Sequence, residues 1–236
     1  KTKMNKAIVI LQPQTAKSQA ATMYIEDIFD DYKIKIIEKR PMRGEDLICF
    51  GVIDAYYGDT ATNALAPSLA KVKVNDADKA LFKEHFDEDW DTLAKEGKIL
   101  SAAMALEKFE DESKFLSAWA KYGAEELNPD LYISYFDEID AFVLNGFYYA
   151  FKRPYTLEDA FVMALKVEFD IPWDTFNYDV IGTENPAAAT EESIRGYIYD
   201  RAAALEITVD GIENVVHASR NEEEAMRDEK IWFGSF

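Results

Sequence analysis

The sequence predicts an α+β fold, and three observations at its amino-terminal end point to it. Residues 6–11 are a run of branched apolar residues that stops at Pro13, the pattern of a buried strand. Residues 20–32 place apolar side chains at helical spacing among acidic ones, which predicts an amphipathic helix. Residues 33–39 alternate basic and branched residues and predict a second strand. A strand, a helix and a second strand begin a layered fold of sheet and helices.

The next part of the chain predicts helices. Residues 46–65 are helical in pattern and rich in aromatic residues, and Pro67 ends that segment. Residues 76–122 carry several short apolar stripes at helical spacing, with Gly97 and Gly123 at positions typical of helix ends. This block therefore predicts a run of short helices.

Strand patterns return after the helical block. Residues 131–136 and 141–151 are both strand-like. Asn145-Gly146 could instead form a tight turn that divides the second segment into two shorter strands. Residues 156–159 have the form of a helix cap, and residues 165–169 alternate as a further strand does.

Composition excludes several classes of protein. The 236 residues are 48% hydrophobic, which is too apolar for a disordered chain. The net charge of −19 argues against nucleic acid or an anionic membrane as the main partner, because both require a basic surface. Cys49 is the only cysteine, so no internal disulfide can form, and we expect a reducing, cytoplasmic location. No apolar run is long enough to span a bilayer. The chain opens at Lys1 without a secretory pattern, and whether a targeting peptide has been removed stays open.

His217 is the strongest candidate for chemistry. It is one of two histidines, follows two valines and precedes Ala218 and Ser219, with Arg195 and Asn214 upstream. A neutral imidazole is a nucleophile near neutral pH, so His217 is a candidate phosphate acceptor. The alternative is a histidine with a purely structural role.

Four segments around His217 carry a family resemblance: residues 181–186, 193–196, 214–219 and an acidic helix that ends at residues 231–233. They resemble the nucleoside diphosphate kinase family, which reads G-E-T-N-P, T-I-R-G and N-I-I-H-G-S before an acidic helix ending in W-F. The strand and helix at the amino-terminal end are also similar to that family. The resemblance implies a ferredoxin-like α+β core, an antiparallel sheet with covering helices.

The middle of the chain has no counterpart in that family. We therefore interpret residues 1–45 as the first part of the core and residues 46–130 as a mainly helical insertion. Residues 131–236 would be the second part of the core and carry the histidine motif. Residues 198–209 are longer than the resemblance leads us to expect between Arg195 and His217, and we interpret them as a small second insertion.

The resemblance implies a role for each matching residue. His217 would take the terminal phosphate of a nucleoside triphosphate and give it to a diphosphate through a phosphohistidine. The remaining roles are phosphate binding by Arg195, sugar contact by Asn214, a hydroxyl beside the histidine from Ser219, and orientation of the imidazole by Asp228, with Glu229 as an alternative. Mg²⁺ would arrive with the nucleotide, and we expect no metal held by the protein itself.

Three departures from the family bear on phosphate binding. A lysine is replaced by Gln12, a threonine by Glu184 and an arginine by Tyr178. A carboxylate about 4 Å from a phosphate charge costs on the order of 4 kcal/mol at an effective dielectric constant of about 20. We therefore expect weak binding of triphosphates unless other cations compensate. Three candidates for such compensation are Arg220, Arg201 and Lys17.

These observations support hypotheses from different classes. The first is a kinase-like pseudoenzyme with weak or lost phosphotransfer, acting as an interaction subunit of a larger assembly through an apolar surface of the insertion near Trp90 and Trp119. The resemblance implies that such domains occur in cilia and flagella, which makes a cytoskeletal or ciliary setting part of this hypothesis. The second is an active nucleoside diphosphate kinase, and the third is a module that senses nucleotides without transferring phosphate. Whether the chain is an enzyme stays open at this point, as do its nucleotide preference and oligomeric state.

Overall fold

The computed structural model describes residues 3–209 and 214–235 of the chain, so the question of its start at Lys1 lies outside the described residues. It divides the chain into two compact units. Unit 1 comprises Lys1–Val52 and Pro154–Phe236, and unit 2 comprises Ile53–Arg153.

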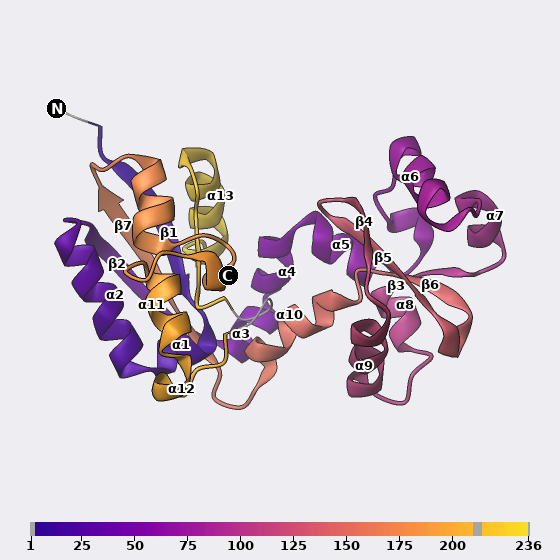
Figure 1. Cartoon of the computed structure of the whole chain (residues 1–236), viewed down its shortest axis with the longest axis horizontal. Coiled ribbons are helices and arrows are strands. Elements are labelled where there is room, and N and C mark those ends of the chain that lie inside the picture. Colours follow the sequence, from indigo (N-terminus) through magenta and orange to yellow (C-terminus); the bar gives the residue numbers. More distant parts are fainter. Residues whose placement is uncertain (1–2, 210–213, 236) are drawn as a thin grey trace. The chain divides into compact units, whose positions relative to one another are not determined.

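Unit 1 is built on a four-stranded antiparallel sheet in the order β2-β7-β1-β8 (Figure 1). Its strands are β1 Asn5–Leu11, β2 Lys35–Arg43, β7 Phe161–Phe169 and β8 Val216–Ala218. With helices between β1 and β2 and between β7 and β8, this is the β-α-β-β-α-β arrangement of the ferredoxin-like fold. The predicted fold class is therefore confirmed.

Helices cover both faces of this sheet (Figure 1). They are α1 Pro13–Lys17, α2 Gln19–Asp31, α3 Gly44–Cys49, α11 Ile194–Asp200, α12 Ala202–Leu205 and α13 Glu222–Trp232, with the π-helix η3 Thr175–Ile181 and the 3₁₀ turn η4 Pro186–Ala188. Val9 and Val167 of the sheet share one apolar core with Ile25 of α2 and Ile198 of α11. Side chains alternate along a strand, so Ile8 points to the other face, which α13 covers.

Unit 2 contains a second four-stranded sheet in the order β3-β6-β5-β4, with β3 parallel to β6 and the other pairs antiparallel. Its strands are β3 Ile99–Ser101, β4 Glu125–Asn128, β5 Leu131–Phe136 and β6 Ala141–Leu144. The helices are α4 Val52–Tyr57, α5 Asp59–Leu65, α6 Asp76–Phe86, α7 Trp90–Lys95, α8 Ala102–Leu106, α9 Glu112–Tyr122 and α10 Phe147–Thr156, with 3₁₀ turns η1 Leu69–Lys71 and η2 Asp137–Ile139. Two apolar clusters, around Phe82 and Phe115, pack on opposite faces of this sheet. None of the described helices is both long enough and apolar enough to cross a bilayer.

The expected division of the chain needs correction. Residues 46–130 are mainly helical, as predicted, but the bounds of the insertion are wrong, because unit 2 is Ile53–Arg153 and also holds a sheet. Residues 131–144, expected in the core that carries His217, pair within unit 2 instead. The strands β3 and β4, which complete this sheet, have three and four residues and are too short for a periodic signal.

The strand predicted over residues 141–151 is also wrong in its second half, and so is the alternative hairpin. Asn145 follows β6 with a φ of 51°, and its buried amide bonds the main chain of Thr60, Asp130 and Tyr132. The helix α10 then begins at Phe147. Aromatic residues favour strands by propensity, but burial of one helical face overrides that preference here.

The predicted helix cap at residues 156–159 is also wrong, because no helix begins there. Thr156 is the last residue of α10, and a turn follows before β7. By contrast, the strands predicted at 6–11 and 165–169 and the helix predicted at 20–32 are confirmed by β1, β7 and α2.

Two isoleucines of the unit 1 sheet provide a matched test of this core. Ile8 is 2% exposed, whereas Ile37, the extra residue of a bulge in β2, is 44% exposed. Ile8→Ala should lower the free energy of unfolding by about 2–5 kcal/mol, because it leaves a cavity in the core. Ile37→Ala should cost below about 1 kcal/mol, and urea unfolding followed by circular dichroism measures both. Equal losses would contradict the arrangement of the sheet.

Candidate functional site

The pairing of β8 with β1 positions His217. His217 lies opposite Ile10, and just beyond the end of β1 the main-chain N–H of Gln12 donates to the Val215 carbonyl at 3.2 Å. This contact turns the Gln12 side chain toward β8, where its Nε2 lies 2.7 Å from Nε2 of His217. Two of the predicted site residues, from opposite ends of the chain, are therefore in direct contact.

His217 is neutral at physiological pH. Burial, and secondarily the positive charge of Arg195, lower the pKa of His217 from 6.5 to about 4. An amide nitrogen only donates, so Nε2 of the ring accepts from Gln12 and the ring proton lies on Nδ1.

Arg195 is buried and bonds to the main chain. The Ser193 hydroxyl accepts from the Gly196 N–H and caps α11, which fixes Arg195 in its first turn. From there Nη1 donates to the Gly182 carbonyl at 3.0 Å and Nη2 to the Val216 carbonyl at 2.9 Å. The guanidinium thus ties α11 to β8 and to the loop at Gly182, and contributes positive charge near His217.

Ser219 and Asp228 form a second buried pair. The Ser219 hydroxyl donates to Asp228 Oδ2 at 2.9 Å and accepts from the Ile8 N–H at 3.1 Å, so it links β8, β1 and α13. Burial raises the pKa of the Asp228 carboxyl, although the bond from Ser219 acts in the opposite direction. The Asp228 carboxylate, which the resemblance led us to expect at the imidazole of His217, bonds to Ser219 and lies 3.4 Å from Nη1 of Arg227. Glu229, the alternative, forms an ion pair with Lys166 at 2.9 Å.

Asn214 and Glu184 are also brought together. Nδ2 of Asn214 donates to the main-chain carbonyl of Glu184 at 2.5 Å, and Oδ1 of Asn214 is buried with no hydrogen-bond donor among the described residues. The Glu184 carboxylate points to Arg220, at 3.1 Å, and Arg220 also pairs with Glu224 at 2.9 Å.

The Arg220 cluster was not predicted. Arg220 was expected to compensate for lost phosphate-binding cations, but it lies between two carboxylates, Glu184 and Glu224. The spacing of four residues between Arg220 and Glu224 at the start of α13 could have indicated this pair. Arg201, another expected compensator, stacks at 3.9 Å over Tyr197, which in turn stacks on Tyr24. Lys17 is exposed at the end of α1.

The described residues offer no metal site of their own. Between residues 3 and 209 and between 214 and 235, no three His, Cys, Asp or Glu side chains are grouped to hold an ion. A magnesium ion that came with a nucleotide would take its ligands from phosphate and water.

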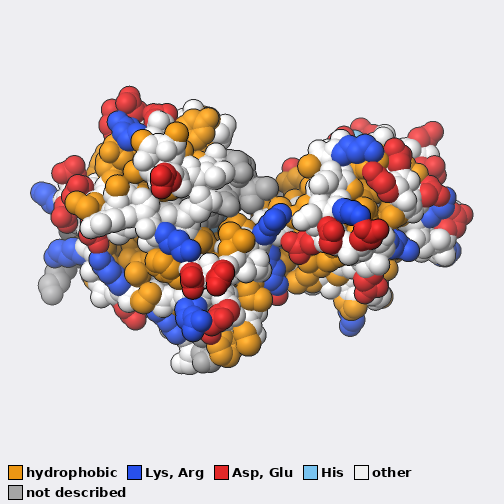
Figure 2. Space-filling view, turned by 90° about the horizontal axis from the view of Figure 1, so that it is seen from below, with side chains coloured by type: hydrophobic (Ala, Val, Ile, Leu, Met, Phe, Trp, Pro, Cys, Tyr) orange, Lys and Arg blue, Asp and Glu red, His pale blue; other side chains and the backbone are white. Residues whose placement is uncertain are grey.

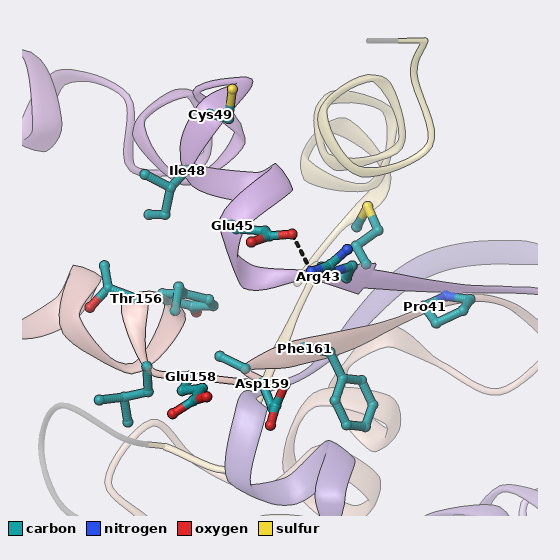
Figure 3. A pocket seen from close by; sticks show the side chains of 13 residues that line it. Pro41, Arg43, Glu45, Ile48, Cys49, Thr156, Glu158, Asp159 and Phe161 are labelled. Atoms are coloured by element: carbon teal, nitrogen blue, oxygen red, sulfur yellow. Dashed lines mark ion pairs between the residues drawn. The ribbon is translucent and has the colours of Figure 1, made fainter.

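A groove of ≈ 900 Å³ in unit 1 is lined by a different set of residues (Figure 3). It lies between the end of β2, the helix α3 and the turn before β7. Its lining carries the carboxylates of Glu45, Glu158 and Asp159 and one cation, Arg43, which pairs with Glu45. This negative lining disfavours phosphate groups, so the residues around His217 remain the candidate site.

Comparison with known proteins adds to this geometry. No family model matches the chain. Two nucleoside diphosphate kinases, from the CNRZ 1066 and ATCC BAA-250 / LMG 18311 strains of Streptococcus thermophilus, are each 46% identical to it over 56 residues. The chain is similar to nucleoside diphosphate kinases. The matched segment is 24% of this chain and 37% of each relative's length. The resemblance predicted from the motifs is thereby confirmed.

Solved structures of nucleoside diphosphate kinases are also similar. The enzyme from Pyrobaculum aerophilum has a TM-score of 0.44 and 16% identity, with 98% of this chain and 96% of that chain covered. The enzyme from Aquifex aeolicus has a TM-score of 0.43 and 11% identity, with 97% and 94% covered. The enzyme from Borrelia burgdorferi, solved as a transition-state mimic with bound vanadate and ADP, has a TM-score of 0.40 and 13% identity, with 98% of this chain and 87% of that chain covered. These TM-scores and identities are too low to support an argument about chemistry, so we argue the chemistry from the residues of this chain alone.

The depressed pKa of His217 predicts how stability depends on pH. Between pH 6.5 and about 4 the unfolded chain binds a proton at this residue that the folded chain does not. The free energy of unfolding should therefore fall as the pH falls through this range, by on the order of 3 kcal/mol from His217 alone.

Urea unfolding of the wild type and of His217→Gln over this pH range isolates the effect, because His217→Gln has no group to titrate there. The comparison is needed since Asp228, whose pKa is raised, contributes in the opposite direction. The wild type should lose more stability than the variant, and the same pH dependence in both would show that His217 is not held neutral.

Proposed function

We propose that unit 1 is a nucleoside diphosphate kinase-like domain that binds nucleoside di- or triphosphates and in which phosphotransfer is weak or lost. The observation that carries this proposal is the contact of 2.7 Å between the Gln12 amide and Nε2 of His217. In this contact the neutral amide of Gln12 bonds one ring nitrogen of His217, the candidate nucleophile. The resemblance leads us to expect a lysine at the position of Gln12. Phosphate then meets one positive charge fewer beside His217, and each 1.4 kcal/mol or so of lost attraction is about tenfold in affinity.

Two arginines, Arg195 and Arg220, already bond groups of the protein. Nη1 and Nη2 of Arg195 bond two main-chain carbonyls, and Arg220 lies between Glu184 and Glu224. Arg220 and Glu184 are both largely exposed, and an exposed ion pair contributes about 0–1 kcal/mol. A phosphate could displace it, but Glu184 and Glu224 would still leave this corner of the site negative.

Asn214 supports nucleotide binding in spite of these losses. Its buried Oδ1 has no donor among the described residues, and such an unmet acceptor costs about 1–3 kcal/mol. A hydroxyl of a bound sugar would supply the missing donor. The resemblance assigns a sugar contact to this residue, so the geometry and the motif support the same ligand.

We further propose that the chain serves as an interaction subunit in a larger assembly, with unit 2 as the part that contacts other chains. Unit 2 is a compact unit with its own sheet and cores, and the residues around His217 belong to unit 1. The predicted apolar surface near Trp90 and Trp119 is wrong, because Trp90 is buried and Trp119 is partly buried against Phe136 and Phe147. Carboxylates are spread over the face that Figure 2 shows, and the net charge is −19, so we expect a partner with basic side chains.

An active kinase is the second candidate, and two observations favour it. His217 is held neutral, which is the protonation state that a nucleophilic imidazole requires. Two residues after His217, the Ser219 hydroxyl donates to the buried Asp228 carboxylate, so both groups that the resemblance assigns to the site are held in place.

Transfer of phosphate to the protein itself tests the proposal. The wild type, incubated with Mg²⁺ and terminally labelled ATP, should acquire little acid-labile label. Gln12→Lys restores a cation beside His217 and should label at least about tenfold faster. His217→Ala should acquire none. Gln19→Lys, the same substitution at an exposed residue of α2, is the matched control and should behave as the wild type.

Rapid labelling of the wild type that chases onto added diphosphate, with no gain in Gln12→Lys, would contradict the proposal and establish the second candidate. Circular dichroism of each variant shows whether it is folded, so that a loss of label is not mistaken for a loss of structure.

A further inference from the structure

The Gln12 side-chain amide is fixed in position, but only its nitrogen has a hydrogen-bond partner among the described residues. The residue is 7% exposed, and its main-chain N–H is fixed to Val215. Its Nε2 lies 2.7 Å from Nε2 of His217, whereas its Oε1 is buried with no hydrogen-bond donor among the described residues. A buried acceptor without a donor costs about 1–3 kcal/mol, so this orientation of the amide is destabilised in the chain without ligand.

The two ends of a glutamine amide have nearly the same shape and opposite hydrogen-bonding character. Rotation about the last torsion exchanges them, and this torsion has a broad, roughly two-fold preference. In the turned orientation Oε1 would face Nε2 of His217, which must then carry the proton. The amide NH₂ would take the former place of Oε1 and would require an acceptor.

We propose that Gln12 is a positioning residue that couples phosphate binding to the tautomer of His217. Without ligand, the amide NH₂ donates to Nε2 and the ring proton lies on Nδ1. When a phosphate oxygen of a nucleoside di- or triphosphate accepts from the turned amide, the ring proton moves to Nε2 and the lone pair to Nδ1. This inference rests on the proposed function, because it concerns the same ligand and the same site.

The alternative to such an exchange is addition of a proton to the ring. Burial and the charge of Arg195 both disfavour the doubly protonated imidazolium, so the ring keeps one proton and only its position changes. A lysine at this position could not support the exchange, because an ammonium group has no acceptor for Nε2–H. The coupling is therefore a property of glutamine.

The experiment uses nitrogen-15 NMR of the whole chain labelled at histidine. With two histidines in the sequence, each ring gives a separate set of signals, and the shifts of Nδ1 and Nε2 show which nitrogen carries the proton. His85 lies in unit 2 beside Glu125 and is the internal control. For His217 we expect the Nδ1–H tautomer in the free chain and the Nε2–H tautomer once Mg·ADP is raised until the shifts stop changing. The His85 tautomer should stay the same.

Two variants separate the role of Gln12 from a general effect of the ligand. In Gln12→Glu the carboxylate only accepts, so His217 should show Nε2–H without any nucleotide at mildly alkaline pH. In Gln12→Met the side chain has similar length and bonds to neither nitrogen, so ADP should leave the tautomer of His217 unchanged. Both variants are compared only after circular dichroism shows the fold of the wild type.

Three results would overturn the inference. They are Nε2–H in the free wild type, an Nδ1–H tautomer in Gln12→Glu, and binding of ADP without a change of tautomer in the wild type. The last result would leave the proposed function standing. Absence of any ADP-dependent shift, by contrast, would overturn nucleotide binding and the coupling together.

Discussion

The candidate site depends on the antiparallel pairing of β8 with β1. Three residues of β8 lie beside the end of β1, and this register puts His217 opposite Ile10 and within reach of Gln12. The same pairing lets Ser219 bond both Ile8 and Asp228, which joins α13 to the sheet. A shift of the β8 register by one residue would turn His217 to the opposite face of the sheet, so the position of its imidazole depends on this register.

This constraint also shows why the site is poor in free positive charge. Burial makes charged and polar groups costly unless they are bonded, and here they are bonded mostly to the protein itself. Nη1 and Nη2 of Arg195 stabilise two main-chain carbonyls, and Gln12 donates to His217. The unit 1 fold is therefore stabilised by groups that a phosphate would otherwise bind. Oε1 of Gln12 and Oδ1 of Asn214 are buried acceptors without a donor among the described residues, and they define what a ligand would have to supply or rearrange.

Sequence patterns predicted the structure correctly where a periodic segment was long enough or where several motif residues lay close together in the sequence. They predicted β1, α2 and β7, and the family resemblance assigned Gln12 and His217 to one site, where the two side chains are in contact. They failed where tertiary contacts decide. The aromatic run after Asn145 has strand propensity, yet it forms α10 because one helical face is buried. Likewise, nothing in the residue types of Arg195 or Arg220 indicates that their charges face carbonyls and carboxylates of the chain rather than solvent.

Nη1 and Nη2 of Arg195, the Gln12 amide and the Arg220 guanidinium already bond groups of the protein itself. The most direct measurement is the affinity of the wild-type chain for Mg·ADP by isothermal titration calorimetry at moderate salt. We expect a dissociation constant of about 1 mM or weaker, which corresponds to about −4 kcal/mol of binding free energy. A dissociation constant in the low micromolar range would require cations directed at the phosphates, so these side chains could not be held by the protein as described.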